Sequence, residues 1–393
     1  MTWEPILDGE LAQRAWVAVH DVADALATVD QPSPDLALFW TYLAAASDDA
    51  KTAARTDAAM TKFAREIESG IRGVRLYGGL TGAGWIAGHV ADDVEPFLEI
   101  VDTALIDALA VEPWTYDYDL IGGLAGMAVY FLDRAGPASS RGLARIVEHL
   151  DTLAVTTPKG ITWHTAPDLL PEYQRVQSPE GYYNCGLAHG VPGVVAVLGK
   201  IAARPDAPAA AARLCDGAIS WLLAERDPGG WPAAIDGGAR SPTRAAWCYG
   251  DPGVLVAMWN ANARRGQSTA EIDRFDGWMT RPLKGSGAVD TGLCHGTGGL
   301  AHLANRFYQA TRNPDYRAAA ITWYEHTLEM RNTEPIAGFP QYVPIPEPGE
   351  AHWRGTPAFL DGAAGVAMTL LAGLVPIEPE WDRLMLCDLP VHE

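Results

Sequence analysis

The sequence predicts an all-α protein, an α/α toroid of about seven inner and outer helix pairs, and three observations support this prediction. First, six Gly-x-x-Gly turns recur along the 393 residues at intervals of 44 to 67 residues. Second, an apolar stretch follows each turn, as in 127–132, 194–198 and 366–371. Third, longer stretches between the turns carry apolar residues at three- and four-residue spacing. Repetition of one such unit is typical of a repeat architecture.

Each turn is expected to begin an inner helix, because glycine permits a tight turn and a close approach of neighbouring helices. The turns, which should all lie at one rim, begin at Gly79, Gly123, Gly190, Gly250, Gly296 and Gly362. The amphipathic stretches that should cover the outside are 94–111, 138–154, 207–224 and 313–331. Residues 8–29 and 35–47 are interpreted as a seventh pair without the glycine signature. The spacing leaves an open solenoid as the alternative to a closed ring.

The turns extend over most of the chain, so residues 1–393 are interpreted as a single toroid domain. Two segments interrupt the pattern, 158–184 and 333–356, and both are long, Pro-rich and irregular. Loops of this kind in a compact fold usually have a function or bind a partner.

Composition excludes several classes of protein. The formal charge of −20 argues against nucleic acid and anionic membrane as ligands, and it suits a basic or neutral peptide. No apolar run is long enough to span a membrane, and the N-terminus lacks the pattern of a secretory signal, so a cytoplasmic protein is expected. The five cysteines are odd in number and widely spread, which does not indicate a disulfide framework. Their thiols are then available for metal binding or catalysis.

Metal-binding residue types stand immediately before two neighbouring turns. Cys248 lies two residues before Gly250, and Cys294 and His295 directly precede Gly296. Two thiolates and one imidazole favour zinc, and three protein ligands with an open fourth position are the pattern of a catalytic site. The alternative interpretation is that both cysteines are buried apolar residues.

Three further polar residues are expected near the same rim. His189 directly precedes Gly190 and could act as a general acid or base. Arg244 and Asp119 each lie four residues before a rim position, where an arginine can stabilise an enolate and an aspartate can orient a histidine or an arginine. Each also has a structural interpretation, as a helix-end histidine or an ordinary ion pair. Asp361, beside the last turn, is expected to cap a helix.

Four segments together resemble the lanthionine synthetase C-like family, and the resemblance covers essentially the whole chain. The segments are Tyr118–Gly126, Gly186–Gly193, Trp247–Gly253 and Leu293–Gly299. The resemblance implies an α/α toroid with a zinc ion at one end of its cavity. According to this resemblance, the zinc ligands correspond to Cys248, Cys294 and His295. The positions around the metal correspond to Asp119, His189, Arg244 and Tyr249.

The function that the resemblance implies is that of a lanthionine synthetase, a zinc-dependent lanthipeptide cyclase of antibiotic biosynthesis. Such an enzyme adds a peptide cysteine to dehydroalanine or dehydrobutyrine, which forms a (methyl)lanthionine thioether. The substrate would be a precursor peptide dehydrated by a separate enzyme, since the chain is too short to include a dehydratase domain. The segment 158–184 would be a reduced peptide-handling insertion or a long loop.

In the expected mechanism Arg244 stabilises the enolate and His189 protonates it, while Asp119 orients one of them. Tyr249, zinc-bound water and the substrate itself are alternative proton donors. Two other functions stay open. A zinc-dependent protein prenyltransferase would need a basic pocket for a diphosphate, and no Lys/Arg cluster lies near the turns. A non-catalytic scaffold of the same family would bind the peptide without converting it.

Overall fold

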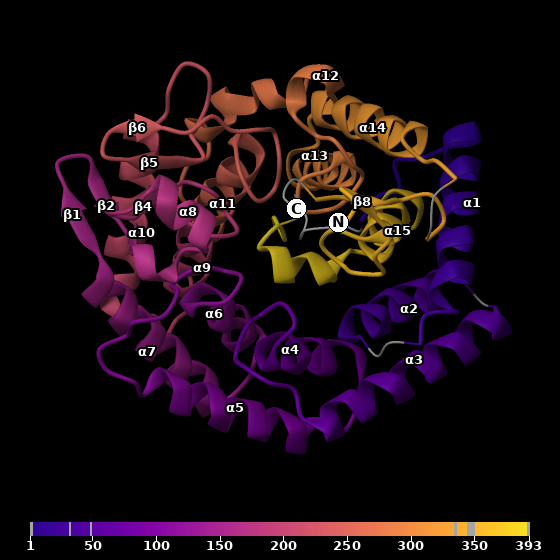
Figure 1. Cartoon of the computed structure of the whole chain (residues 1–393), viewed down its shortest axis with the longest axis horizontal. Coiled ribbons are helices and arrows are strands. Elements are labelled where there is room, and N and C mark those ends of the chain that lie inside the picture. Colours follow the sequence, from indigo (N-terminus) through magenta and orange to yellow (C-terminus); the bar gives the residue numbers. More distant parts are fainter. Residues whose placement is uncertain (1–2, 31–32, 48, 334–335, 344–349, 391–393) are drawn as a thin grey trace.

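The computed structural model describes residues 3–30, 33–47, 49–333, 336–343 and 350–390, and within them helices form a closed ring (Figure 1). Along the chain, inner and outer helices alternate. The inner helices are α2 (Pro34–Ala46), α4 (Leu80–Val90), α6 (Leu124–Asp133), α9 (Val191–Ala202), α11 (Asp251–Arg264), α13 (Thr297–Thr311) and α15 (Ala363–Leu374). The outer elements are α1 (Gly9–Leu26), α3 (Ala50–Ser69), α5 (Glu95–Leu109), α7 (Pro137–Leu153), α10 (Ala209–Ala224), the 3-10 helix η2 (Ile272–Trp278) and α14 (Pro314–Glu329).

Each inner helix contacts the next one around the ring, and α15 contacts α2, so the ring closes. The α/α toroid predicted from the glycine turns is therefore the fold of the chain, and the open solenoid is excluded. Inner helices are buried on nearly all sides, as in α13, where every residue from Thr297 to Ala310 is buried. Outer helices bury one stripe only, which is the pattern of an amphipathic surface helix.

The expected pairing of residues 8–29 with 35–47 was wrong. α1 covers the last inner helix, α15, whereas α2 is covered by α3, a helix that the glycine pattern did not reveal. The reason is the closure of the ring, since α15 receives its outer cover from the beginning of the chain. Asp49 caps α3 by accepting hydrogen bonds from the backbone N–H groups of Lys51 and Thr52.

The second glycine of each turn is required by one repeated close approach. A side chain at Gly82 would place its Cβ 1.8 Å from the carbonyl oxygen of Leu76, and one at Gly253 would lie 2.0 Å from that of Trp247. In all six turns the obstructing carbonyl belongs to the residue six positions earlier. The second glycine of the repeat is thus needed because the preceding loop packs tightly against the first turn of each inner helix.

Backbone hydrogen bonds join successive turns along the rim. They run from Leu76 N to Ile121 O, Leu120 N to Ala188 O, Ala188 N to Cys248 O, Cys248 N to Cys294 O and Cys294 N to Leu360 O. Residues at equivalent repeat positions are therefore held side by side.

Short strands and helices lie in the connections between the helices of the ring. The antiparallel hairpin of β1 (Val155–Thr157) and β2 (Gly160–Thr162) packs on α10. A four-stranded antiparallel sheet combines β3 (His164–Thr165), β4 (Tyr182–Asn184), β5 (Ala234–Asp236) and β6 (Ala239–Arg240). The remaining elements are η1 (Pro167–Leu169), α8 (Glu172–Gln177), α12 (Leu283–Ser286), the β7 (Gln341–Tyr342) and β8 (Trp353–Arg354) pair, and η3 (Glu380–Met385). The segment 158–184 is thus largely structured, while residues 334–335 and 344–349 of the segment 333–356 lie outside the described residues.

The 3-10 helix η3 fills part of the ring's interior (Figure 1). The indole of Trp247 donates to the carbonyl oxygen of Met385 at 2.9 Å, and the Tyr77 hydroxyl donates to that of Leu384 at 2.8 Å. The fully buried Arg306 pairs with Asp382 and holds η3 from the side of α13. Among the described helices, none combines the length and apolar character that crossing a membrane would need.

Candidate metal centre

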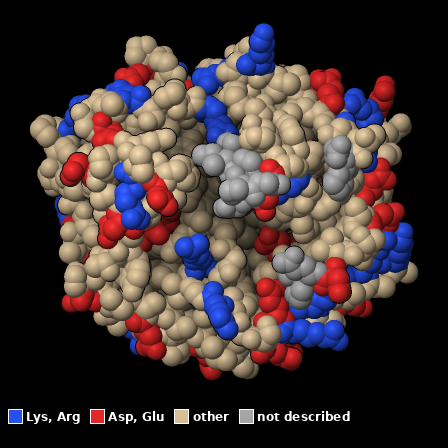
Figure 2. Space-filling view, in the orientation of Figure 1, with Lys and Arg blue, Asp and Glu red and all other residues tan. Residues whose placement is uncertain are grey.

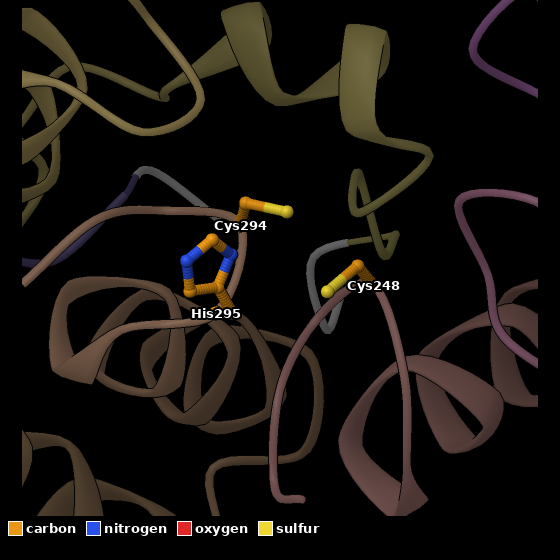
Figure 3. A group of neighbouring side chains, drawn as sticks. All are labelled: Cys248, Cys294 and His295. Atoms are coloured by element: carbon orange, nitrogen blue, oxygen red, sulfur yellow. The ribbon is translucent and has the colours of Figure 1, made fainter. Parts of the chain in front are cut away.

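Cys248, Cys294 and His295 meet at the rim, as the repeat positions predict. Their ligand atoms, two sulfurs and one ring nitrogen, all lie within 4.8 Å of one another. Figure 3 shows both thiol groups and one edge of the imidazole facing a common space. The direct hydrogen bond from Cys248 N to Cys294 O, 3.2 Å long, brings the two loops together without any metal.

The three side chains perturb one another's protonation. The hydrogen bond from the Cys294 thiol lowers the pKa of Cys248. The nearby positive charges of His295 and Arg244 lower it further. Cys294 has the opposite shift, because a neighbouring thiolate and burial raise its pKa. Burial opposes protonation of His295, but Asp290 and Cys248 outweigh it and raise the pKa of the imidazole to about 10. Cys248 is therefore the member of the cluster that is shifted towards its donor form, the thiolate. Cys294 and His295 hold their protons more strongly and would release them on binding a metal.

Two carboxylates face the ring of His295. Asp290 Oδ2 lies 3.4 Å from Nε2, and Asp361 Oδ1 lies 3.6 Å from Nδ1. Asp361 Oδ1 is buried and accepts no hydrogen bond from the described residues. The expectation that Asp361 caps α15 was wrong, since the N-cap residue of that helix is Gly362 and no side chain caps it. Two thiols, an imidazole and an unsatisfied carboxylate oxygen beside it fit a zinc ion.

His189 and Asp119 form a pair at the neighbouring turns. His189 Nδ1 lies 2.6 Å from Asp119 Oδ2, while Asp119 Oδ1 accepts from the backbone N–H of Gly122 at 2.8 Å. Asp119 is buried, but the His189 side chain is 47% exposed and can reach a ligand. Burial opposes protonation of His189, yet the hydrogen bond and charge of Asp119 raise its pKa above the usual value. Asp119 is therefore in contact with His189, one of the two residues that it is predicted to orient.

Arg244 and Tyr249 both border a cavity next to the same rim. Within the described part of the chain, no carboxylate pairs with the Arg244 guanidinium, which borders a cavity of about 460 Å³. A second cavity of about 290 Å³ is bordered by Asp119 and His189. Tyr249 borders both. Figure 2 shows a hollow near the middle of the ring with acidic and basic side chains around it.

Sequence reasoning missed two buried polar residues beside this site. Asn184 on β4 is 1% exposed and donates to the Tyr249 hydroxyl at 3.0 Å. Asp290 is 2% exposed and lies against His295. A polar residue two positions before the Gly186–Gly193 motif, and another four before Cys294, were the available signals.

Comparisons with known proteins agree with this picture. A family model described as lanthionine synthetase C-like protein matches residues 32–386. Among solved structures, nisin cyclase matches with a TM-score of 0.75 over 95% of this chain and 97% of that one, at 18% sequence identity. At that identity the match establishes the shared toroid fold. Because the family model spans most of its length, this chain belongs to the lanthionine synthetase C-like family.

Proposed function

We propose that the protein is a zinc-dependent lanthipeptide cyclase, a lanthionine synthetase that forms thioether rings in a dehydrated peptide. The observation that carries the proposal is the convergence, on one rim, of a three-ligand metal cluster with the His189–Asp119 pair. A structural metal site usually has four protein ligands and no acid–base pair beside it.

Cys248, Cys294 and His295 would hold the zinc ion. Zinc held there would supply a Lewis acid, which would favour the ionised form of a substrate thiol at neutral pH. The surroundings of the cluster support this role, since Asp290 Oδ2 lies 3.4 Å from Nε2 of His295, where its charge favours one orientation of the ring.

The remaining residues act on the other reaction partner, the dehydrated residue. As the substrate sulfur forms a bond to its β-carbon, the electron pair of the C=C bond moves towards the carbonyl group and gives an enolate. The guanidinium of Arg244, with which no carboxylate of the described residues pairs, stabilises that charge. His189, whose protonated form is favoured by the hydrogen bond to Asp119, delivers a proton to the α-carbon, which completes the thioether without loss of mass.

The substrate we propose is a precursor peptide dehydrated by a separate enzyme. The segment 158–184 supports peptide binding, because Tyr173 and Gln174 on α8 and Tyr182 on β4 border the cavities beside the catalytic residues. We place the reaction in the cytoplasm, where thiols stay reduced, and all five cysteines of the chain are free.

The test is incubation of the zinc-loaded protein with a dehydrated peptide that carries one free cysteine. Cyclisation leaves the peptide mass unchanged and removes the thiol, so alkylation followed by mass spectrometry should show a falling alkylated fraction. Added mass from a supplied prenyl diphosphate would indicate a prenyltransferase instead. Binding with the thiol still free would indicate a scaffold. The Cys294→Ala protein is the control for uncatalysed addition.

A further inference from the structure

The two cavities beside the metal centre share one wall. Residues that border both cavities are Gln174, Tyr182, Asn184 and Tyr249. Arg244 borders only the larger cavity, and His189 borders only the smaller one. Tyr249 therefore stands between the group proposed to stabilise the enolate and the group proposed to protonate it.

The orientation of the Asn184 side chain is determined by its neighbours. Its Oδ1 accepts a hydrogen bond from the backbone N–H of Gly186 at 2.9 Å, and only the oxygen of an amide can do so. Its NH₂ group must then face the other partner, the Tyr249 hydroxyl, at 3.0 Å. Asn184 is fixed by the sheet, where it is paired with Ala234.

A phenol that accepts this hydrogen bond can still donate one hydrogen bond with its own hydroxyl proton. The proton cannot point at Asn184, because the amide presents only N–H groups there. Among the described residues, none accepts a hydrogen bond from Tyr249.

We propose that Asn184 is a positioning residue that turns the proton of the Tyr249 hydroxyl into the shared groove, where it donates to the carbonyl oxygen of the dehydrated residue. The part that concerns the substrate rests on the proposed function. Tyr249 and Arg244 then act on the same oxygen from the larger cavity, while His189 addresses the α-carbon from the smaller one. The wall between the cavities thereby separates charge stabilisation from proton delivery.

The decisive variant is Asn184→Asp, which keeps the shape and the acceptor for Gly186 N–H. The introduced carboxylate faces Tyr249 and captures its proton, so donation to substrate is lost. We expect kcat to fall by about 10²–10³-fold, the cost of a lost donor to an oxyanion, with KM and zinc content little changed. Tyr249→Phe should match it, and the double variant should be no slower than Tyr249→Phe alone. Asn313→Asp, which preserves the cap of α14, is the matched control and should keep the wild-type kcat.

Wild-type kcat in Asn184→Asp would overturn the proposal. So would a double variant slowed by the product of the two single effects, because Asn184 would then act independently of Tyr249.

A measurement without substrate separates this inference from the proposed function. Tyrosine labelled with ¹³C at Cζ is incorporated, and the Tyr249 signal is assigned by its loss in Tyr249→Phe. A phenol that accepts a hydrogen bond has its Cζ signal upfield of one that donates. Asn184→Leu, which removes the amide donor, should therefore move the signal downfield. An upfield movement would show that Tyr249 donates to Asn184 and would overturn the inference, even if wild-type protein failed to cyclise any peptide.

Discussion

Single side chains divide the proposed site into a metal-holding part and a proton-handling part, and their loss should have different effects. Cys294→Ala removes a thiolate ligand, so we expect zinc content to fall from about one ion per chain to a small fraction. Elemental analysis of the purified proteins measures this. Cys215→Ala is the matched control and should retain zinc, since that buried thiol on α10 donates to the carbonyl oxygen of Val195 and lies outside the metal cluster. Full zinc in Cys294→Ala would refute the ligand assignment.

Asp290 should matter to the metal without touching it. Its carboxylate accepts from the backbone N–H groups of Gly292 and Tyr342 and lies against His295 Nε2. In Asp290→Asn the charge that favours the ring orientation is lost, and zinc affinity should fall by about 10–100-fold. Competition with a chelating dye measures the affinity. Asp216→Asn on the outer face serves as control, and equal affinities in both variants would remove Asp290 from the site.

His189 should affect the reaction and leave the metal alone. We expect His189→Asn to retain zinc and bind peptide, yet to form rings about 10²–10⁴-fold more slowly, the range for a lost general acid or base. Time-resolved thiol alkylation with zinc analysis of the same sample measures both. Wild-type rates with metal intact would make His189 a structural residue and move the proton donor to Tyr249 or to the substrate.

The pH dependence of the rate should report on Asp119. The Asp119 carboxylate raises the pKa of His189, so the imidazolium form persists at higher pH than that of a free histidine. As a proton donor, His189 is active below its pKa, and kcat should decline as pH rises through that value. In Asp119→Asn the pKa is lower, so the decline should begin at lower pH. An unchanged alkaline limb would show that another group titrates.

Among the elements, the turn before α11 offers the sharpest test of the glycine pattern. Gly253→Ala places a methyl group against the Trp247 carbonyl, 2.0 Å from the ideal Cβ position, so the loop that carries Cys248 must shift. We expect weaker zinc binding together with a lower melting temperature. Gly229→Ala, where nothing lies within 4 Å of the added carbon, should change neither. Calorimetry and dye competition compare the two, and identical behaviour would contradict the close-packing explanation.

The elements that could be predicted from sequence are those with a local signal. The glycine turns and the apolar periodicity predicted the inner helices and most outer ones, including α5, α7, α10 and α14. The pairing of α1 with α15 could not be predicted, because it joins helices more than 300 residues apart and depends on closure of the ring. The four-stranded sheet was not predicted, because strands of two or three residues are too short to show an alternation of apolar and polar residues.

The site shows the same division between local and long-range signals. Cys248 and Cys294 share a repeat position and His295 directly follows Cys294, so the sequence predicted their convergence. No repeat position identifies Asn184 in the sequence. Its proposed role depends on the pairing of β4 with β5 and on contact with Tyr249, 65 residues away. Asp361 was predicted to cap a helix because it lies close to a helix start. In the structure its side chain lies next to His295 instead.

At the scale of the whole molecule, the fold should survive removal of the metal. The core extends around the entire ring, and the rim hydrogen bond between Cys248 and Cys294 joins their loops without an ion. We expect chelation to leave the far-ultraviolet circular dichroism unchanged and mainly helical. The melting temperature should drop only by the contribution of zinc binding. Loss of helical signal on chelation would show that the metal organises the fold.

Closure of the ring by α1 and α15 also has a consequence for how the protein is made. On the ribosome α1 is synthesised long before α15, and until then the face that carries Val19 and Val22 has no partner. Cys248 and Cys294 are likewise translated while the circle is still open. A nascent chain therefore holds an unfinished arc with exposed apolar helices, the state in which chaperones act and aggregation begins. Only after α15 leaves the exit tunnel can the two edges of the arc meet and the molecule mature as one unit.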